Sequence, residues 1–233
     1  CRGSLKIYRD RAALEEGIAL ANLLAGTGVT PDILDPAGIV RVEPALQEVA
    51  AHLVGAIHFP DDESGDAYRF CSALAQTLSR QGVEIRGNVE AIGFVLAGQQ
   101  AAALQTSVGN MEADAFVLSA GIHSPQLGAG LGLKLPIQPV KGYSITVPMM
   151  GNGVMPRMPV VDDARHVAMT PMDGFLRVAG TAEFAGFDLS LTPARIENLK
   201  QVVGEIFPGC LPGPKVDVRA WAGLRPYSCD GVP

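Results

Sequence analysis

Trp221-Ala-Gly-Leu-Arg-Pro-Tyr-Ser-Cys-Asp-Gly-Val-Pro233 is the stretch around which the rest of the chain is organised. The alternating Val216 and Val218 predict a strand that runs into it and presents Arg225 at its end. A guanidinium is planar, always charged and offers two parallel donors, so Arg225 is a candidate clamp for a carboxylate. An ordinary surface arginine at a strand end fits the same pattern. The sequence stops shortly after Asp230, in what reads as an unfinished turn, and we expect the rest of this site to lie outside it.

The amino-acid composition limits the classes of protein to which this chain can belong. With 48% hydrophobic residues, 18% charged residues and a mean hydropathy of +0.22, the 233-residue chain should bury a real core. A net charge of -6 and a pI near 5.2 argue against nucleic acid as a partner. No apolar run reaches the roughly 18 residues of a membrane span. The chain begins at Cys1 without a signal segment, so we expect a piece of a longer protein.

The four cysteines are far apart in the sequence and form no C-x-x-C pair. Such a distribution predicts free thiols in a reducing compartment. The residues are Cys1, Cys71, Cys210 and Cys229.

Helices and strands alternate irregularly along the chain. Helices are expected after Asp10, Asp66 and Thr192, because each is a capping residue followed by apolar residues at three- and four-residue spacing. Residues 30–44 read as a loop-like connector that leads into a short helix at 43–46, and 60–66 as an acidic turn. Asp173-Gly174 predicts a hairpin turn. Strands are expected at 4–9, 54–59, 83–86, 89–96, 101–108, 115–118, 135–147, 160–161, 167–169 and 175–180.

A second candidate feature is the junction Ser119-Ala-Gly-Ile-His-Ser-Pro125, which follows the expected strand 115–118. Ala120 and Gly121 have almost no side chain, so a ligand's phosphate or sugar could approach the backbone closely. A plain turn explains the pattern equally well.

Several kinds of site have no support in the sequence. The four histidines lack metal-ligand spacing, and neither a G-x-S-x-G elbow nor a phosphate-binding G-x-x-x-x-G-K-[ST] loop occurs. The acids at 61–66 do not match a calcium loop, and Cys229 has no nearby base. His58, at a strand end, and Tyr143, after the Lys141-Gly142 bend, remain polar candidates, although satisfied structural residues of this kind are commoner. The residues alone therefore give a mixed sheet-and-helix fold with one anion clamp and one ligand-contacting turn.

Three stretches carry a resemblance to a known family: Phe59-Pro-Asp-Asp-Glu-Ser-Gly-Asp66, Pro139-Val-Lys-Gly-Tyr-Ser144 and Trp221-Ala-Gly-Leu-Arg-Pro226 followed by Asp230-Gly231. The chain resembles the FAD-dependent amino-acid oxidoreductases of the glycine oxidase, D-amino-acid oxidase and D-amino-acid dehydrogenase type. The likeness extends in the same order over nearly all 233 residues. The family's amino-terminal G-x-G-x-x-G, which holds the FAD pyrophosphate, is absent from this sequence.

The resemblance implies an α+β fold, with an antiparallel-sheet substrate domain that has helices on one face and with part of the sheet of an FAD-binding domain. The implied division is 1–80 and 133–220 for the substrate domain, 81–132 for the FAD-domain portion, and 221–233 returning toward the flavin. A carboxy-terminal segment of the family is also absent. The 233 residues alone are therefore expected to be inactive and to bind FAD poorly.

The resemblance also implies roles for individual residues. Arg225 would pair with the substrate carboxylate, and Tyr143 would lie with Lys141 and Gly142 at the bend that borders the flavin ring. Tyr143 and His58, the polar candidates found from the residues alone, are the other expected substrate-binding residues. Ala168 stands where the family has a substrate-side tyrosine. The implied cofactor-binding residues are Val89 near the adenine, Ala120 and Gly121 near the pyrophosphate, and Lys141 and Gly142 beside the flavin ring.

The implied reaction of the whole protein is oxidation of a D-amino acid to an imine, which water converts to a 2-oxo acid and ammonia. The partner would be a small amino acid, and the resemblance favours a dehydrogenase at the cytoplasmic face of the membrane. Oxygen and a quinone chain both stay open as the electron acceptor. Two alternatives stay open: an FAD-dependent 2-hydroxy-acid dehydrogenase, which needs the same clamp, and a non-catalytic module that binds an acidic ligand.

Overall fold

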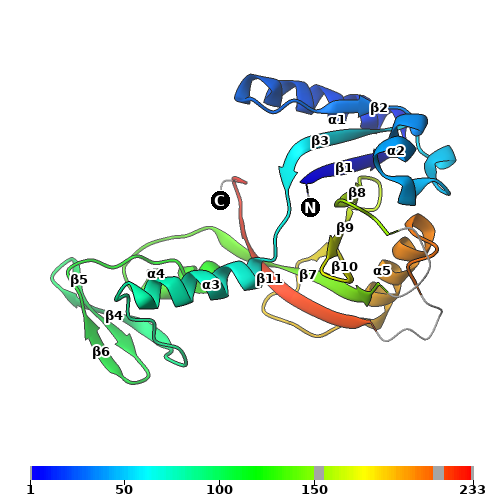
Figure 1. Ribbon diagram of the computed structural model, residues 1–233. Coiled ribbons are helices and arrows are strands. Elements are labelled where there is room, and N and C mark those ends of the chain that lie inside the picture. Colours follow the sequence, from blue (N-terminus) through cyan, green and yellow to red (C-terminus); the bar gives the residue numbers. More distant parts are fainter. Residues whose placement is uncertain (1, 150–154, 212–217, 232–233) are drawn as a thin grey trace. The chain divides into compact units, whose positions relative to one another are not determined.

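An eight-stranded mixed sheet and a three-stranded antiparallel sheet make up the strands of this computed structural model, which describes residues 2–149, 155–211 and 218–231. The large sheet has the order β11-β7-β10-β9-β8-β1-β3-β2. Its strands are β1 (Arg2–Tyr8), β2 (Asp32–Leu34), β3 (Gly55–Glu63), β7 (Ile137–Pro148), β8 (Val160–Asp162), β9 (Val167–Met172), β10 (Phe175–Glu183) and β11 (Arg219–Ser228). β1 pairs antiparallel with β3 and parallel with β8 (Figure 1).

The small sheet has the order β4-β5-β6, with β4 (Ala91–Ala97), β5 (Gln100–Thr106) and β6 (Gly109–Glu112). The α-helices are α1 (Arg11–Leu24), α2 (Pro36–Val42), α3 (Ala67–Arg80), α4 (Ser124–Ala129) and α5 (Pro193–Ile206). Short 3-10 turns lie at Ala25–Thr27, Pro44–Leu46, Ala50–His52 and Gly121–His123.

The chain divides into two compact units. The sheet unit comprises Cys1–Asp66, Gly142–Ala182 and Leu189–Gly223, and the α3 unit comprises Ala67–Lys141, Glu183–Asp188 and Leu224–Pro233. The mixed α and β composition agrees with the predicted fold class. The division into functional parts at 1–80, 81–132, 133–220 and 221–233 stays a prediction.

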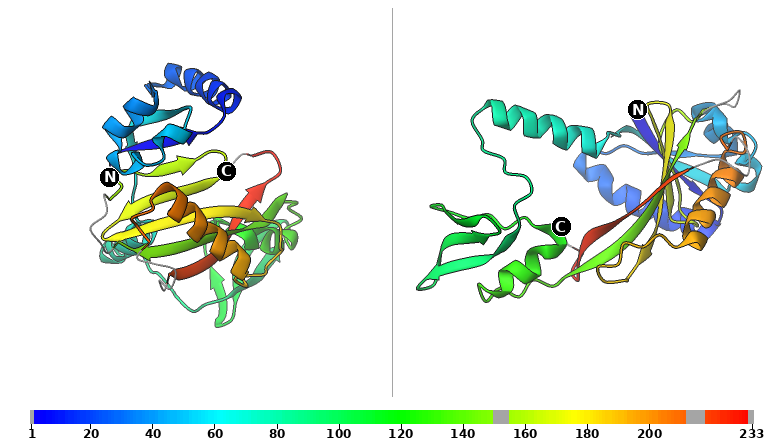
Figure 2. Two further views of the ribbon diagram at one scale, coloured as in Figure 1. Left: turned by 90° about the vertical axis from the view of Figure 1, so that its right-hand side faces the viewer. Right: turned by 90° about the horizontal axis from the view of Figure 1, so that it is seen from below.

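The core of the sheet unit lies between its sheet and α5. Apolar residues of α5 pack against alternate residues of β7, β9 and β10, and α5 crosses that face of the sheet in Figure 2. Gly180 permits this close approach, because a Cβ there would lie 2.8 Å from Val167 Cγ2 and 3.1 Å from Leu199 Cδ2. The buried α5 residues are Leu199, Val202, Val203 and Ile206.

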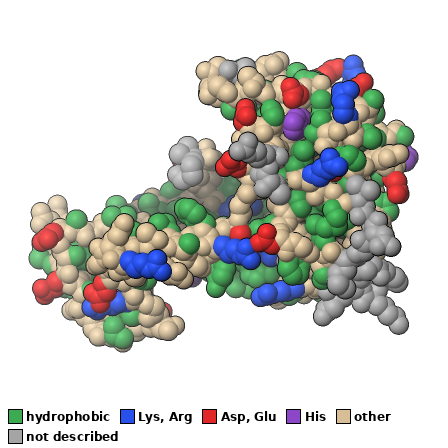
Figure 3. All heavy atoms as spheres, in the orientation of Figure 1, with side chains coloured by type: hydrophobic (Ala, Val, Ile, Leu, Met, Phe, Trp, Pro, Cys, Tyr) green, Lys and Arg blue, Asp and Glu red, His purple; other side chains and the backbone are tan. Residues whose placement is uncertain are grey.

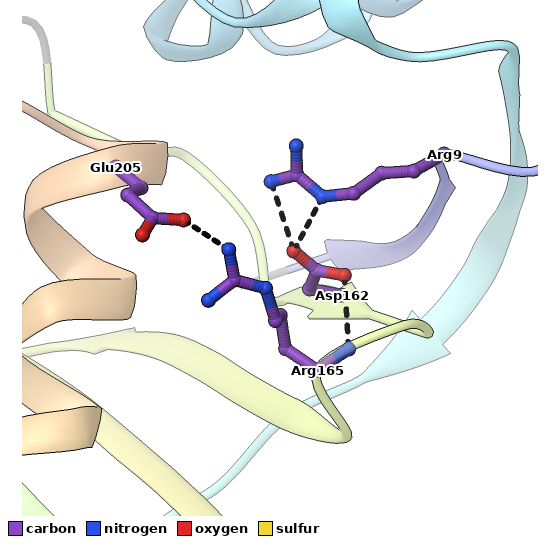
Figure 4. A network of polar contacts seen from close by, with 4 residues as sticks. All are labelled: Arg9, Asp162, Arg165 and Glu205. Atoms are coloured by element: carbon purple, nitrogen blue, oxygen red, sulfur yellow. Dashed lines mark hydrogen bonds and ion pairs between the residues drawn. The ribbon is translucent and has the colours of Figure 1, made fainter.

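A polar network joins the end of β1 to β8 and α5 within the sheet unit (Figure 4). The buried carboxylate of Asp162 accepts hydrogen bonds from Arg9 Nε and Nη2, at 3.2 and 3.1 Å, and from the Arg165 backbone N–H at 3.3 Å. Arg165 Nη2 donates to Glu205 Oε2 on α5. The Arg9 guanidinium and the Arg165 N–H satisfy the Asp162 carboxylate, and the Arg165 side chain ties the β8–β9 turn to α5, so we assign the network a structural role.

Most predicted elements are present. Asp10 caps α1 through the Ala13 N–H at 3.0 Å, α3 begins at Ala67, and α5 begins at Pro193 after Thr192. Asp173 and Gly174 both have positive φ, 36° and 84°, and connect the paired residues Met172 and Phe175 as predicted. The expected strand residue Val216 and the thiol of Cys1 lie outside the described residues.

Two strand predictions are wrong: residues 83–86 and 115–118 do not form strands. Their side chains alternate as strands do, but a strand also needs a neighbour for its N–H and C=O groups, and neither segment has one within the described ranges. Val83, Ile85 and Val117 are therefore exposed, Val117 by 91%. The expected strand 89–96 begins only at Ala91, which leaves Val89 outside it.

Two connectors were also predicted wrongly. Residues 30–44 contain β2 and α2, because Asp35 accepts a hydrogen bond from the Gly38 N–H and Pro36 occupies the first helical turn. Pro36 and Pro44 each begin a helical segment instead of preventing one. The predicted acidic turn at 60–66 is in part the end of β3, which continues to Glu63.

The α3 unit exposes much apolar surface. The apolar face of α3 forms as the residue spacing predicts, but the helix has no buried residue, and Phe70 is 68% exposed. Hydrophobic side chains are accordingly visible on the surface over this part of the chain (Figure 3). The predicted helix face therefore has no covering layer in the described residues.

Candidate functional site

Arg225 lies in β11 and is exposed. It makes no hydrogen bond or ion pair with any residue in the described ranges 2–149, 155–211 and 218–231. By contrast, Arg177 donates to Thr146 Oγ1 at 3.0 Å and lies over the Trp221 ring, 5.6 Å from its centroid. An exposed guanidinium without a protein acceptor keeps both of its parallel donors available for an anion.

Lys141 is placed differently from what its position at a bend would indicate. β7 is continuous through it, and its side chain is 1% exposed in the α3 unit. Its Nζ lies 2.8 Å from Asp188 Oδ2 and 3.8 Å from Glu183 Oε2. A buried ammonium needs such carboxylates, because desolvation otherwise disfavours its charged form.

Residues Glu183–Asp188, which begin at the last residue of β10, form a segment that we term the aromatic connector. Phe187 stacks on His123 with ring centroids 5.5 Å apart, and Phe184 makes an edge contact with Tyr227 at 6.2 Å. Its two acids are the partners of Lys141. The connector therefore contacts three stretches, each of which carries residues that the sequence predicted for the site.

Sequence reasoning missed the connector. A signal was present, since Glu183-Phe-Ala-Gly-Phe-Asp188 places two aromatic residues and two acids around a glycine between a strand and a helix. Nothing in the local pattern, however, identifies partners that lie 40 or more residues away.

Ala120 and Gly121 lie in the α3 unit at the start of the 3-10 turn Gly121–His123. Gly121 has a φ of 55°, and no atom lies within 4 Å of where its Cβ would be. The backbone at this turn is thus open to a close approach, as the small residues predicted. The expected preceding strand is missing.

Val89 lines an open hollow of about 220 Å³ in the same unit. The other lining residues are Glu84, Arg86, Ala91, Leu104, Thr106 and Met111. A hydrogen bond from Arg86 Nε, 2.6 Å from Glu84 Oε1, and the positive charge of Arg86 lower the pKa of Glu84. The hollow therefore combines an apolar floor with one ion pair at its edge.

The remaining predicted residues belong to the sheet unit. Tyr143 is buried in the core with its hydroxyl 3.1 Å from Thr192 Oγ1, and His58 Nδ1 lies 3.3 Å from Asp32 Oδ2. Gly142 belongs to β7, and Ala168 lies in β9 opposite Ala179. Arg225, Val89, Ala120, Gly121 and Lys141 thus belong to the α3 unit, whereas Gly142, Tyr143 and His58 belong to the sheet unit.

The described part of the chain offers neither a metal cluster nor a membrane-spanning helix. No group of three or more His, Cys, Asp or Glu side chains there could hold a metal ion. Within those same residues, no helix is long and apolar enough to cross a membrane.

All residues from 1 to 233 match the protein family described as DAO, FAD dependent oxidoreductase. Curated relatives include D-amino acid dehydrogenases from Paramagnetospirillum magneticum, 40% identical over 233 residues, and from Vibrio cholerae, 37% identical over 232 residues. This chain covers 54% and 55% of those two proteins, so it spans about half the length of the curated relatives it matches.

Solved structures have the same fold. The chain superposes along its whole length on glycine oxidase from Geobacillus kaustophilus with a TM-score of 0.87 at 24% identity, covering 60% of that chain. L-proline dehydrogenase from P. horikoshii gives a TM-score of 0.88 at 19% identity, with 62% of that chain covered.

Proposed function

The chain belongs to the FAD-dependent oxidoreductase family, and from this premise we propose that the whole protein oxidises D-amino acids, with Arg225 as the clamp for the substrate carboxylate. The observation that carries the proposal is the exposed guanidinium of Arg225, which has no acceptor among the described residues, within Trp221-Ala-Gly-Leu-Arg-Pro226. The names of the curated relatives support an amino acid as substrate.

Arg225 would act by orientation. Two parallel hydrogen bonds to the carboxylate fix the plane of that group and so limit the rotation of the attached amine carbon. The substrate changes from amine to imine by losing two electrons and two protons, and water then gives the 2-oxo acid and ammonia. If the substrate amine arrives neutral, no protein acid or base is required at this step.

The residues of the α3 unit fit one side of an FAD site. The hollow beside Val89 could accept the adenine, and the open backbone at Gly121 lets a pyrophosphate approach without a side-chain clash. FAD, when bound, supplies the acceptor for the electrons removed from the substrate. Lys141 would help to hold this side of the FAD site in place, because its ammonium forms ion pairs with Asp188 and Glu183. Direct substrate contacts by Tyr143 and His58 stay predictions.

An activity screen tests the proposal. The purified full-length protein is incubated with D-amino acids, L-amino acids and 2-hydroxy acids in the presence of an artificial electron acceptor. We expect reduction of the acceptor, with 2-oxo acid and ammonia, for D-amino acids. Turnover of 2-hydroxy acids alone contradicts the proposed substrate class, and the lack of both turnover and flavin absorbance favours an acidic-ligand-binding module.

We further propose that electrons pass to a membrane quinone and not to oxygen, because the curated relatives are dehydrogenases by name. The expected result is that D-amino-acid oxidation consumes little oxygen until a quinone is added. Hydrogen peroxide formed in step with the 2-oxo acid would contradict this acceptor.

A further inference from the structure

The aromatic connector, Glu183–Asp188, has unusual anchoring for a segment between a strand and a helix. Its apolar side chains are not buried in a core, since Phe184 is 74% exposed and Phe187 50% exposed. Its backbone turns at Gly186, which has a φ of 60°. One close attachment of the connector is the pair between Asp188 and the buried Lys141, at 2.8 Å.

The Lys141 ammonium can hold the connector because it cannot relax into water. Its side chain is 1% exposed, and its stem belongs to β7. Loss of the Asp188 charge would remove the nearer of these two carboxylates, since Glu183 Oε2 lies 3.8 Å from Nζ. The connector would then shift until Glu183 or water replaced the lost partner.

One ring contact joins the connector to the strand that carries Arg225. Phe184 makes an edge-to-face contact with Tyr227, with ring centroids 6.2 Å apart and planes at 88°. Tyr227 is two residues after Arg225 on β11, and alternate strand residues point to the same side. Phe184, Tyr227, Arg225 and Lys141 all belong to the α3 unit, so a shift of Phe184 is transmitted within one compact body.

We propose that Lys141 and Asp188 are positioning residues, whose ion pair holds Phe184 against Tyr227 and so sets the position of the Arg225 clamp. This role rests on the proposed function, in which Arg225 binds the substrate carboxylate. The same pair also keeps Phe187 stacked on His123, next to the Ala120-Gly121 turn.

Steady-state kinetics of the full-length, FAD-loaded protein test this role. Asp188→Asn removes the charge and keeps the shape, and we expect KM for a D-amino acid to rise about tenfold while kcat changes less than about twofold. Phe184→Leu should raise KM as well. Phe184 is exposed, so this substitution should leave the fold intact. The double variant should be no worse than the more affected single variant, because both changes break one chain of contacts.

A matched control is available on α5, where Glu197→Gln breaks the exposed pair with Lys200 Nζ at 3.6 Å. This variant should leave KM unchanged. An unchanged KM in Asp188→Asn, or additive effects in the double variant, would overturn the positioning role even if thermal stability fell.

Hydrogen exchange separates this inference from the proposed function. Measured without substrate, exchange of the backbone amides at 224–229 should be faster in Asp188→Asn and Phe184→Leu than in the wild type and Glu197→Gln. Faster exchange without any D-amino-acid oxidation would support the positioning role and refute the proposed substrate. Unchanged exchange in both variants would overturn the positioning role, whatever the activity.

Discussion

Charged side chains in this protein differ chiefly in whether a partner is within reach. Arg9 is bound by Asp162 and Lys141 by Asp188, whereas Arg225 is exposed and has no acceptor among the described residues. The exposure of Arg225 agrees with the local sequence, although Arg225 lies inside β11, which continues to Ser228, and not at the predicted strand end. The burial of Lys141 does not follow from local sequence, since its partner is 47 residues away.

At the residue scale, Cys210 should be the least reactive thiol among the described cysteines. Burial, with a smaller effect of the Glu43 carboxylate, raises the pKa of the Cys210 thiol, whereas Cys71 and Cys229 are exposed. A raised pKa keeps the thiol neutral to higher pH, and the folded state loses stability relative to the unfolded state as pH rises above the ordinary thiol pKa. Alkylation by iodoacetamide, followed by mass spectrometry from about pH 7 to 10, should modify Cys210 last. Alkylation of Cys210 at the same pH and rate as Cys71 would contradict this order of reactivity.

Glu43 is a second residue whose substitution has a calculable effect. Its buried carboxylate accepts hydrogen bonds from the backbone N–H groups of Ala45, Arg157 and Met158, at 3.2, 2.6 and 3.3 Å. Glu43→Gln places an NH2 group where an acceptor is needed and should lower the free energy of unfolding by about 2 kcal/mol. Urea denaturation measures this loss of free energy, and Glu48→Gln, at an exposed glutamate, is the control. Equal midpoints for the two variants would show that the buried carboxylate is dispensable.

At the scale of elements, local signals predicted helices better than strands. Asp10 caps α1, Pro193 occupies the first turn of α5 although the Thr192 side chain makes no capping hydrogen bond, and Asp173-Gly174 forms the expected turn between β9 and β10. A strand depends on a partner elsewhere in the chain, so the alternating 83–86 and 115–118 have strand composition without strand structure.

The packing of α1 gives an element-scale prediction. Gly17 faces Tyr8 so closely that a Cβ there would lie 2.3 Å from the Tyr8 hydroxyl, whereas a Cβ at Gly204 of α5 would lie 3.6 Å from Leu211 Cδ1. Gly17→Ala should therefore destabilise by about 1–3 kcal/mol through overpacking, although alanine normally favours a helix. Gly204→Ala should stabilise slightly.

Thermal or urea denaturation distinguishes these two variants. Because the buried Tyr8 hydroxyl has no hydrogen-bond partner within the described part of the chain, Tyr8→Phe should restore part of the stability lost in Gly17→Ala. Equal stability of Gly17→Ala and Gly204→Ala would contradict the close contact between α1 and Tyr8.

At the scale of the whole molecule, the exposed apolar face of α3 is the feature that sequence could not foresee. The spacing of its residues predicts a buried face, and the described chain leaves Leu74 44% exposed while Leu199 on α5 is completely buried. In the 233-residue chain, Leu74→Ser should change the free energy of unfolding by less than about 0.5 kcal/mol, and Leu199→Ser should lower it by about 3 kcal/mol or more. Urea denaturation of both variants checks the contrast, and a large loss in Leu74→Ser would contradict the exposure of α3.

The central claim, that Arg225 binds the substrate carboxylate, is tested most directly by steady-state kinetics of Arg225→Ala in the full-length protein. We predict a rise in KM for D-amino acids of about a hundredfold, because a charge-assisted pair is lost, while the visible absorbance of bound FAD is retained. Arg219→Ala, at an exposed arginine of the same strand, should leave KM unchanged. An Arg225→Ala variant with wild-type KM and intact flavin absorbance would contradict the assignment.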